Sequence, residues 1–345
     1  MLHRARNGLV LVSVLAFLFL AISQITVAAT YAERLGFPAG ARVVILHVDD
    51  AGMSHQSNVG AMRSVTEGVA NSMSVMMPCS WVPELKQMLV KHPGLDVGLH
   101  LTLTSEWSGY RWGPLASRDK VPGLIDPEGA LWPSVEEVAK RATAEEVELE
   151  IRAQIARSRG LGIEPSHLDS HMGTLFARDD YLERYIKVGA EEGIPVMFPG
   201  GHASLLRAQL SGDVGEAEAA VRVGKAQVMA ETVWSLGLPV LDDLHNVSYG
   251  WTAAEHAHWS DQQLADYKVS RYVDALNKLQ PGVTMIIMHN TDADLNFTHI
   301  SESGPTRRGD LLAMLDPRIR QAVVTEKLVL TTWRELGERR RAANE

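Results

Sequence analysis

The 345-residue sequence has little cysteine and no excess of positive charge. Its one cysteine, Cys79, cannot form an internal disulfide, which excludes a cysteine-rich zinc or iron–sulfur site. The 33 lysines and arginines are outnumbered by 42 aspartates and glutamates, giving a formal charge of −9. That charge argues against general binding to nucleic acid or to anionic membranes, which needs clustered basic side chains. With 46% hydrophobic and 22% charged residues, the chain has the composition of a folded globular protein.

The N-terminal 29 residues have the layout of an export signal. A basic segment at 3–6 precedes an almost unbroken apolar run at 9–22, and Val27-Ala28-Ala29 supplies the small residues that signal peptidase requires. We therefore expect residues 1–29 to be a cleaved signal peptide and residues 30–345 to form an exported domain, periplasmic or secreted, without a membrane anchor. The alternative is a retained anchor, because the apolar stretch is nearly long enough to span a bilayer.

Short β-branched runs alternate with amphipathic segments along the rest of the chain. Strands are clearest at 42–48, which ends in two aspartates, and at 282–288. About seven such strands with helices between them predict an α/β fold in one domain, either a parallel sheet or a barrel. Folds of this kind place their chemistry at the carboxyl ends of the strands.

Acidic and histidine side chains occur at the ends of four of the expected strands. These residues are Asp49, Asp50, His100, His167, Asp169, His171 and His289. Two histidines and one carboxylate form a mixed nitrogen and oxygen site that suits Zn²⁺ and tolerates other divalent ions. Because three protein ligands leave coordination positions open for water and substrate, the pattern predicts metal-assisted hydrolysis.

The adjacent pair Asp49-Asp50 needs a turning chain to act in one site, because successive side chains of an extended strand point to opposite faces. At a strand end, one carboxylate can bind metal while the other takes a proton from the attacking water. The alternative is that Asp50, ahead of Ala51-Gly52, only stabilises the turn.

Several segments together resemble the YdjC-like carbohydrate deacetylases, which include chitooligosaccharide and hopanoid-biosynthesis-associated deacetylases and are distantly similar to polysaccharide deacetylases. The segments are HVDDAG at 47–52, GVANSMSVM at 68–76, VGLHLTLT at 97–104, HLDSH at 167–171, and the strand at 281–288 that leads to His289. The resemblance covers residues 42–334. It implies a distorted (β/α) barrel, one divalent metal ion (zinc or magnesium), and hydrolysis of an N-acetyl group on a sugar.

Site roles follow from the resemblance, residue by residue. It implies Asp50, His100 and His171 as metal ligands, Asp49 as the general base, and His289 as the acid that protonates the leaving amine. Asp169 fits the role of orienting a metal-bound histidine by a hydrogen bond. We expect His167 to be a structural histidine rather than a further ligand.

Three positions beside the expected pocket depart from the family pattern. Gly173 and Asn290 stand where relatives often carry histidine and proline, and Ala51 stands where an aromatic residue is common. None of these changes removes a proposed ligand. They leave the metal chemistry in place but weaken the case for the family's usual oligosaccharide substrate.

The irregular stretch at 104–133 supplies candidate substrate-binding residues. Trp107 and Trp112 could stack on sugar rings, and Arg308, beyond His289, could contact an anionic substrate. The alternative is that the tryptophans anchor the loop to the body and that Arg308 is an ordinary surface arginine.

We therefore expect an exported metal-dependent hydrolase that removes an N-acetyl group from a carbohydrate or glycolipid. One alternative is a metal-dependent hydrolase of an ester or phosphoester, because the same water activation serves several electrophiles. The other is a non-catalytic sugar-binding relative, although binding alone needs no base, acid and metal ligands together.

Overall fold

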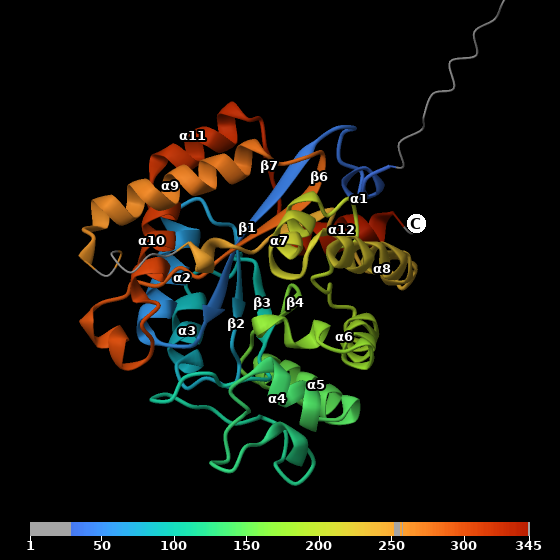
Figure 1. Ribbon diagram of the computed structural model, residues 1–345, viewed down its shortest axis with the longest axis vertical. Coiled ribbons are helices and arrows are strands. Elements are labelled where there is room, and N and C mark those ends of the chain that lie inside the picture. Colours follow the sequence, from blue (N-terminus) through green and yellow to red (C-terminus); the bar gives the residue numbers. More distant parts are fainter. Residues whose placement is uncertain (1–28, 252–255, 257, 344–345) are drawn as a thin grey trace, which may run out of the picture.

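Seven parallel strands form one sheet in the computed structural model, which describes residues 29–251, 256 and 258–343. The strand order is β4-β3-β2-β1-β6-β5, and β7 pairs with β1. The strands are β1 Arg42–Ala51, β2 Ser72–Val75, β3 Val97–Leu101, β4 Leu168–Ser170, β5 Asp243–His245, β6 Gly282–Met288 and β7 Val329–Leu330. The sheet curls into a half-barrel surrounded by helices (Figure 1). The expected single-domain α/β fold with about seven strands is confirmed.

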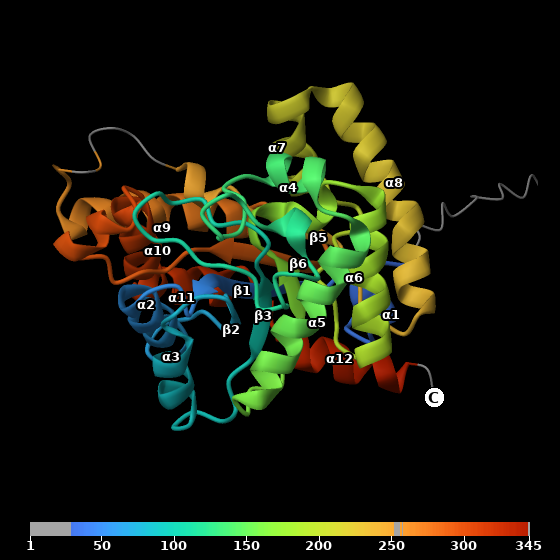
Figure 2. The same ribbon diagram turned by 90° about the horizontal axis from the view of Figure 1, so that it is seen from below.

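Helices cover the sheet on two sides. The longer ones are α2 His55–Thr66, α3 Val82–Leu89, α5 Ala144–Gly160, α6 Asp179–Glu192, α7 Ser204–Val214, α8 Glu216–Ser235, α9 Asp261–Asn277, α10 Gly304–Leu315, α11 Pro317–Thr325 and α12 Trp333–Ala342. Shorter ones are α1 Tyr31–Arg34 and α4 Val135–Arg141, with short 3₁₀ segments η1 Pro122–Leu124, η2 His171–Phe176, η3 Ser248–Gly250 and η5 Leu295–His299. Figure 2 shows α9 and α10 on one side of the strands and α5, α6 and α8 on the other.

Strand β1 lies in the middle of the sheet and is buried on both faces. Val43 and Ile45 belong to an apolar cluster with residues of β6 and α12, whereas the alternate positions 44, 46 and 48 belong to a second and larger cluster. Because side chains alternate along a strand, His47 and Asp49 continue the face of Val43. The apolar packing of that face therefore gives way to polar side chains toward the carboxyl end of the strand.

The sequence pattern also predicts strands at 194–197 and 239–241, but these segments form only isolated parallel bridges. Leu168 pairs with Val196, and Pro199 pairs with Leu241. Each pairing is limited to single residues, so neither segment forms a strand of the named sheet. The bridges nevertheless continue the curl of the sheet from β4 toward β5.

The expected export signal at 1–29 lies outside the described residues, apart from Ala29. Among the helices that the structure describes, none has both the length and the apolar character needed to cross a membrane. The domain opens with α1, which Thr30 and Glu33 cap reciprocally. The backbone N–H groups of Tyr31 and Ala32 donate to the Asp242 carboxylate at 2.8 and 3.0 Å, which ties the first helix to the barrel.

Candidate metal and acid–base site

An irregularity at the end of β1 brings both of its aspartates to one site. The pairing of β1 with β2 shifts register between Val48 and Ala51, and Asp50 has a φ of 65°. That left-handed conformation is uncommon for a residue other than glycine. It allows both carboxylates to approach His100, whose Nε2 lies 3.7 Å from Asp49 Oδ2 and 3.4 Å from Asp50 Oδ1. The end of β1 therefore contains the turn that two adjacent aspartates need in order to act in one site.

Asp50, His100 and His171 form a compact set of ligand atoms. One ligand atom from each residue lies within 4.8 Å of the others, and all three side chains are buried. Asp50 Oδ1 is 3.5 Å from His171 Nδ1 and has no hydrogen-bond partner among the described residues. A buried carboxylate oxygen left without a partner is costly unless a cation satisfies it. The donor set thus fits one divalent metal ion.

Each of the two histidines has a second carboxylate against its other ring nitrogen. His100 Nδ1 lies 2.6 Å from Asp169 Oδ1, and His171 Nε2 lies 3.2 Å from both carboxylate oxygens of Glu106. Such contacts fix the tautomer and the orientation of metal-binding histidines. Asp169 thus contacts a predicted metal-binding histidine, as its expected orienting role requires. Glu106 was not predicted from the sequence, because it lies in the irregular stretch after β3, where no periodic pattern or motif indicates a site residue.

These carboxylates also change the proton affinity of the rings. Burial alone would lower the pKa of His171, but the neighbouring Glu106 and Asp50 carboxylates raise that pKa to about 9. Burial likewise opposes the charged form of His100, and Asp49 and Asp169 outweigh it, so the pKa of His100 is raised well above its usual value. Protons and a metal ion therefore compete for the same ring nitrogens.

A buried arginine holds the second oxygen of Asp50. Arg307 Nη1 lies 2.7 Å from Asp50 Oδ2, and each of the two side chains is only 2% exposed. Burial by itself would raise the pKa of Asp50, but Arg307 and the site histidines hold it well below the usual range. The carboxylate is therefore ionised, with one oxygen paired to Arg307 and the other turned toward the two histidines.

Arg308, the arginine predicted to contact substrate, lies next to Arg307 on α10, and it is Arg307 that enters the site. Arg308 Nη1 pairs with Asp292 at 2.7 Å, and its Nε bonds Asp261 at 2.6 Å. Consecutive helical residues point about 100° apart, since a turn has 3.6 residues. Arg307 therefore reaches Asp50, while Arg308 is occupied by surface carboxylates.

The two carboxylate oxygens of Asp49 have different surroundings. Oδ1 lies 3.1 Å from His47 Nε2 and accepts a hydrogen bond from Ser74 Oγ at 3.4 Å. Oδ2 faces the ligand set and lies 3.7 Å from His100 Nε2 and 3.9 Å from His289 Nε2. One oxygen is thus held by the protein interior, and the other is available for proton transfer.

His289 follows the carboxyl end of β6 and faces Asp49. Its ring packs edge-on against Tyr249, with centroids 5.0 Å apart, and its Nδ1 has no hydrogen-bond partner among the described residues. Burial lowers the pKa of His289. The backbone N–H of His289 donates to Asp310 Oδ2 at 3.2 Å. This bond fixes the main chain at His289, whereas no hydrogen bond fixes the ring among the described residues.

The two candidate tryptophans occupy different environments. Trp112 is buried, and its indole N–H donates to the backbone oxygen of Thr104 at 2.9 Å. Because this ring is covered by protein, the structure favours the alternative that Trp112 anchors the loop to the body. Trp107 is partly exposed, and its ring centroid lies 5.7 Å from the Arg307 guanidinium carbon, next to the site.

A family model described as YdjC-like protein matches residues 43–325. The chain belongs to the YdjC-like family. It is 29% identical over 309 residues to a carbohydrate deacetylase of Thermus thermophilus, a match that covers 89% of this chain and 97% of the relative. It is 26% identical over 292 residues to a carbohydrate deacetylase of Thermoanaerobacter pseudethanolicus, covering 85% of this chain and 98% of that one. The resemblance stated from the sequence is confirmed.

The fold also has a match among solved structures. A crystal structure of a putative cellobiose-phosphate cleavage protein from Enterococcus faecalis superposes with a TM-score of 0.64 at 17% sequence identity. The superposition covers 86% of this chain and 99% of that one. At this identity the likeness shows that the two chains share a fold.

Proposed function

We propose that the protein is an exported, metal-dependent deacetylase that hydrolyses an N-acetyl group on a carbohydrate or glycolipid. One observation carries the proposal. At the carboxyl ends of the strands, the candidate metal ligands Asp50, His100 and His171 lie close to the Asp49 carboxylate, which in turn faces His289. The names of the full-length relatives support an acetylated sugar as the substrate class. The signal-like sequence at 1–29 supports export.

One divalent ion, zinc or magnesium, held by Asp50, His100 and His171 would supply the Lewis acidity that polarises the amide carbonyl and makes water a better nucleophile. Arg307 keeps Asp50 Oδ2 occupied, so Oδ1, which lies against the two histidines, would be the oxygen that holds the ion. Asp169 and Glu106 hold the two histidine rings in the orientation that aims one nitrogen of each at Asp50.

Asp49 and His289 provide the proton path. Asp49 Oδ2 accepts a proton from the attacking water, while contacts at Oδ1 keep the carboxylate in place. His289 Nε2, 3.9 Å from that oxygen, is placed to receive the proton and to deliver it to the leaving nitrogen. A histidine whose pKa is lowered by burial releases the proton readily. Water and the amide thereby give acetate and an amine.

The test is acetate release from a panel of N-acetylated sugars and glycolipids, with O-acetylated sugars alongside. Each substrate is assayed with untreated protein, after chelation, and after the return of zinc or magnesium. We expect N-acetyl cleavage that is lost on chelation and restored by metal. Protein that holds one tightly bound metal ion and releases no acetate from any N-acetylated member would contradict the proposal, and release from the O-acetylated sugars alone would indicate an esterase.

Export is tested separately by the N-terminus of the mature protein. Expression of the full chain in a bacterial host, followed by N-terminal sequencing of the periplasmic or secreted fraction, is expected to give a chain that begins at Thr30. Recovery of only full-length chain in the membrane fraction would show that the segment is a retained anchor.

A further inference from the structure

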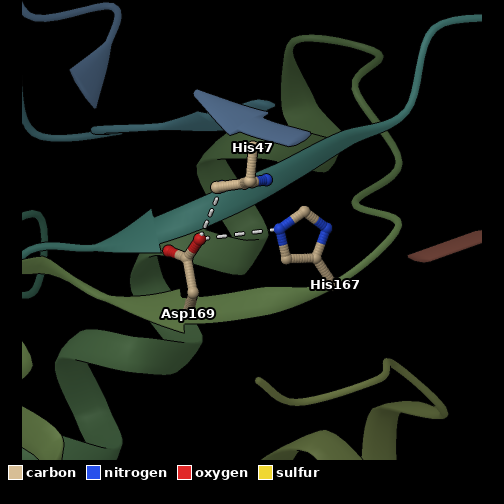
Figure 3. Close-up of side chains that lie close together, drawn as sticks. All are labelled: His47, His167 and Asp169. Atoms are coloured by element: carbon tan, nitrogen blue, oxygen red, sulfur yellow. Dashed lines mark ion pairs between the residues drawn. The ribbon is translucent and has the colours of Figure 1, made fainter. Parts of the chain in front are cut away.

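A layer of buried polar side chains lies beneath the proposed proton path and takes no direct part in it. Its members are His47, Ser72, Ser74, His167 and Asp169. Figure 3 shows the Asp169 carboxylate facing both histidine rings, which pack edge-on against each other and come from different strand regions of the sheet. Burying a polar side chain costs more free energy than burying an apolar one. A cluster of buried polar side chains therefore indicates a functional role.

His47 is the most connected member of the layer. The ring is fully buried, its Nδ1 lies 2.9 Å from Ser72 Oγ, and its Nε2 lies 3.0 Å from Ser74 Oγ. The same Nε2 is 3.1 Å from Asp49 Oδ1 and 3.0 Å from Asp169 Oδ2. The strand register explains the serine contacts, because His47 of β1 is paired with Ser72 of β2, and Ser74 follows on the same face.

We propose that His47 is a positioning residue that holds the catalytic base and the carboxylate behind the metal ligand His100 in one fixed arrangement. The proposal rests on the proposed function. A single atom, His47 Nε2, lies at ion-pair distance from both Asp49 and Asp169. Asp169 in turn contacts His100 Nδ1 at 2.6 Å, so displacement of the His47 ring would release the base and one metal ligand together.

Charge gives a second reason for a histidine at this position. Two carboxylates that share a dry interior need a positive partner, since an uncompensated buried charge is strongly destabilising. Burial alone would lower the pKa of His47, but Asp169 and Asp49 beside the ring raise it to about 9. At neutral pH the ring is therefore a cation at ion-pair distance from both carboxylates, and its two nitrogens are hydrogen-bonded to Ser72 and Ser74.

His167 provides a matched contrast within the same layer. It is as fully buried as His47, and its Nε2 lies 3.5 Å from the same Asp169 oxygen without a hydrogen-bond partner among the described residues. Its ring stacks on Trp333 at 5.1 Å and lies against Gly98, where an added Cβ would come within 2.3 Å of the ring. His167 fills space and does not reach Asp49.

The experiment compares the same substitution at the two histidines. His47→Leu is expected to lower kcat and to weaken metal affinity by about 10–100-fold, the range for partners of metal ligands, with little change in KM. His167→Leu is expected to leave both quantities close to wild type. His47→Gln, which can place an N–H near the position of Nε2, should recover more of both quantities than His47→Asn, which is one methylene shorter.

Metal affinity separates failure of this proposal from failure of the proposed function. If wild-type protein releases no acetate, zinc titration of the same variants still tests whether His47 supports His100 through Asp169. Wild-type affinity and kcat in His47→Leu would overturn the proposal, as would equal losses in His167→Leu. Two zinc ions per wild-type chain, with one lost in both leucine variants, would instead make the layer a second metal site.

The glutamine and asparagine variants keep the test decisive if His47→Leu does not fold. Both keep a polar group in the buried layer, and they differ only in the reach of the side chain. A higher kcat and tighter metal binding for His47→Gln than for His47→Asn is the result the proposal requires. Equal values for the two variants would contradict it.

Discussion

The histidines of the site are held in two different ways. In His100 and His171, the ring nitrogen that faces away from Asp50 contacts a carboxylate. The carboxylate of Asp169 lies 2.6 Å from His100, and that of Glu106 lies 3.2 Å from His171. The ring of His289 has no such partner among the described residues: its Nδ1 is unpaired, and its Nε2 is 3.9 Å from Asp49. A histidine that binds a fixed ion needs a fixed ring and tautomer, whereas one that carries protons must change its protonation state in every turnover.

The support behind His289 acts on its backbone rather than on its ring. Asp310 accepts from the His289 N–H, and its other oxygen lies 2.8 Å from Lys268 Nζ and accepts from the Tyr272 hydroxyl at 2.8 Å. Lys268 and Asp310 are almost fully buried. One half of the site is therefore oriented through side chains, and the other half through the main chain.

The largest contrast should come from truncating one histidine of each kind. His100→Ala removes a metal ligand, so metal content is expected to fall to near zero and activity to disappear with it. His289→Ala should keep one metal ion per chain and lose turnover only. Metal analysis of both purified variants, combined with acetate assays, makes the comparison. Full metal content in His100→Ala would show that the ligand assignment is wrong.

Removal of the base should lower turnover without affecting metal binding. Asp49→Asn keeps the shape of the side chain but not its basicity, so kcat should fall by about 10²–10⁴-fold at unchanged metal content. Asp292→Asn makes the same chemical change in a carboxylate that pairs with Arg308 and Arg63, and kcat should stay near wild type. Turnover like that of wild type in Asp49→Asn would remove Asp49 from the mechanism.

The carboxylates behind the metal ligands should have a smaller effect. Glu106→Gln keeps the size of the side chain but weakens its hold on His171, so metal affinity is expected to fall by about 10–100-fold. Titration of chelated protein with zinc measures that change. Glu128→Gln, in the same irregular stretch but paired with Arg111, is the control. An affinity for zinc equal to wild type in Glu106→Gln would mean that His171 is oriented by packing alone.

The positioning histidine, His47, is expected to affect the pH dependence of stability. The folded pKa of His47, about 9, lies above the usual value of 6.5, so its contribution is complete below pH 6.5 and is lost as the pH rises through 9. The difference in unfolding free energy between wild type and His47→Gln, measured with urea in the presence of chelator, should shrink by up to about 3 kcal/mol across that interval. A constant difference would show that His47 is neutral in the folded protein.

Local patterns in the sequence were sufficient for much of the fold and for part of the site. The strands, and the polar residues at their carboxyl ends, could be predicted because a short run of β-branched residues and the residue that ends it are adjacent in the chain. The structure brings Asp49, Asp50, His100, His171 and Asp169 together at those ends, with His289 opposite.

The residues that were missed lie where no local pattern exists. Arg307 contacts Asp50 across 257 positions of sequence, and its burial depends on which face of α10 meets the barrel. Glu106 lies in an irregular loop, so its contact with His171 follows from the path of the loop rather than from a repeat. Trp112 could not be told from an exposed tryptophan, because composition does not show which face of a loop is covered.

Metal-dependent deacetylation at this site can be tested by titrating metal-free protein with zinc or magnesium while acetate release from an N-acetylated sugar is followed. We expect chelated protein to be inactive and activity to rise in proportion to added metal until one ion is bound per chain. Acetate release at the full rate from metal-free protein, or none with one ion bound per chain, would contradict it.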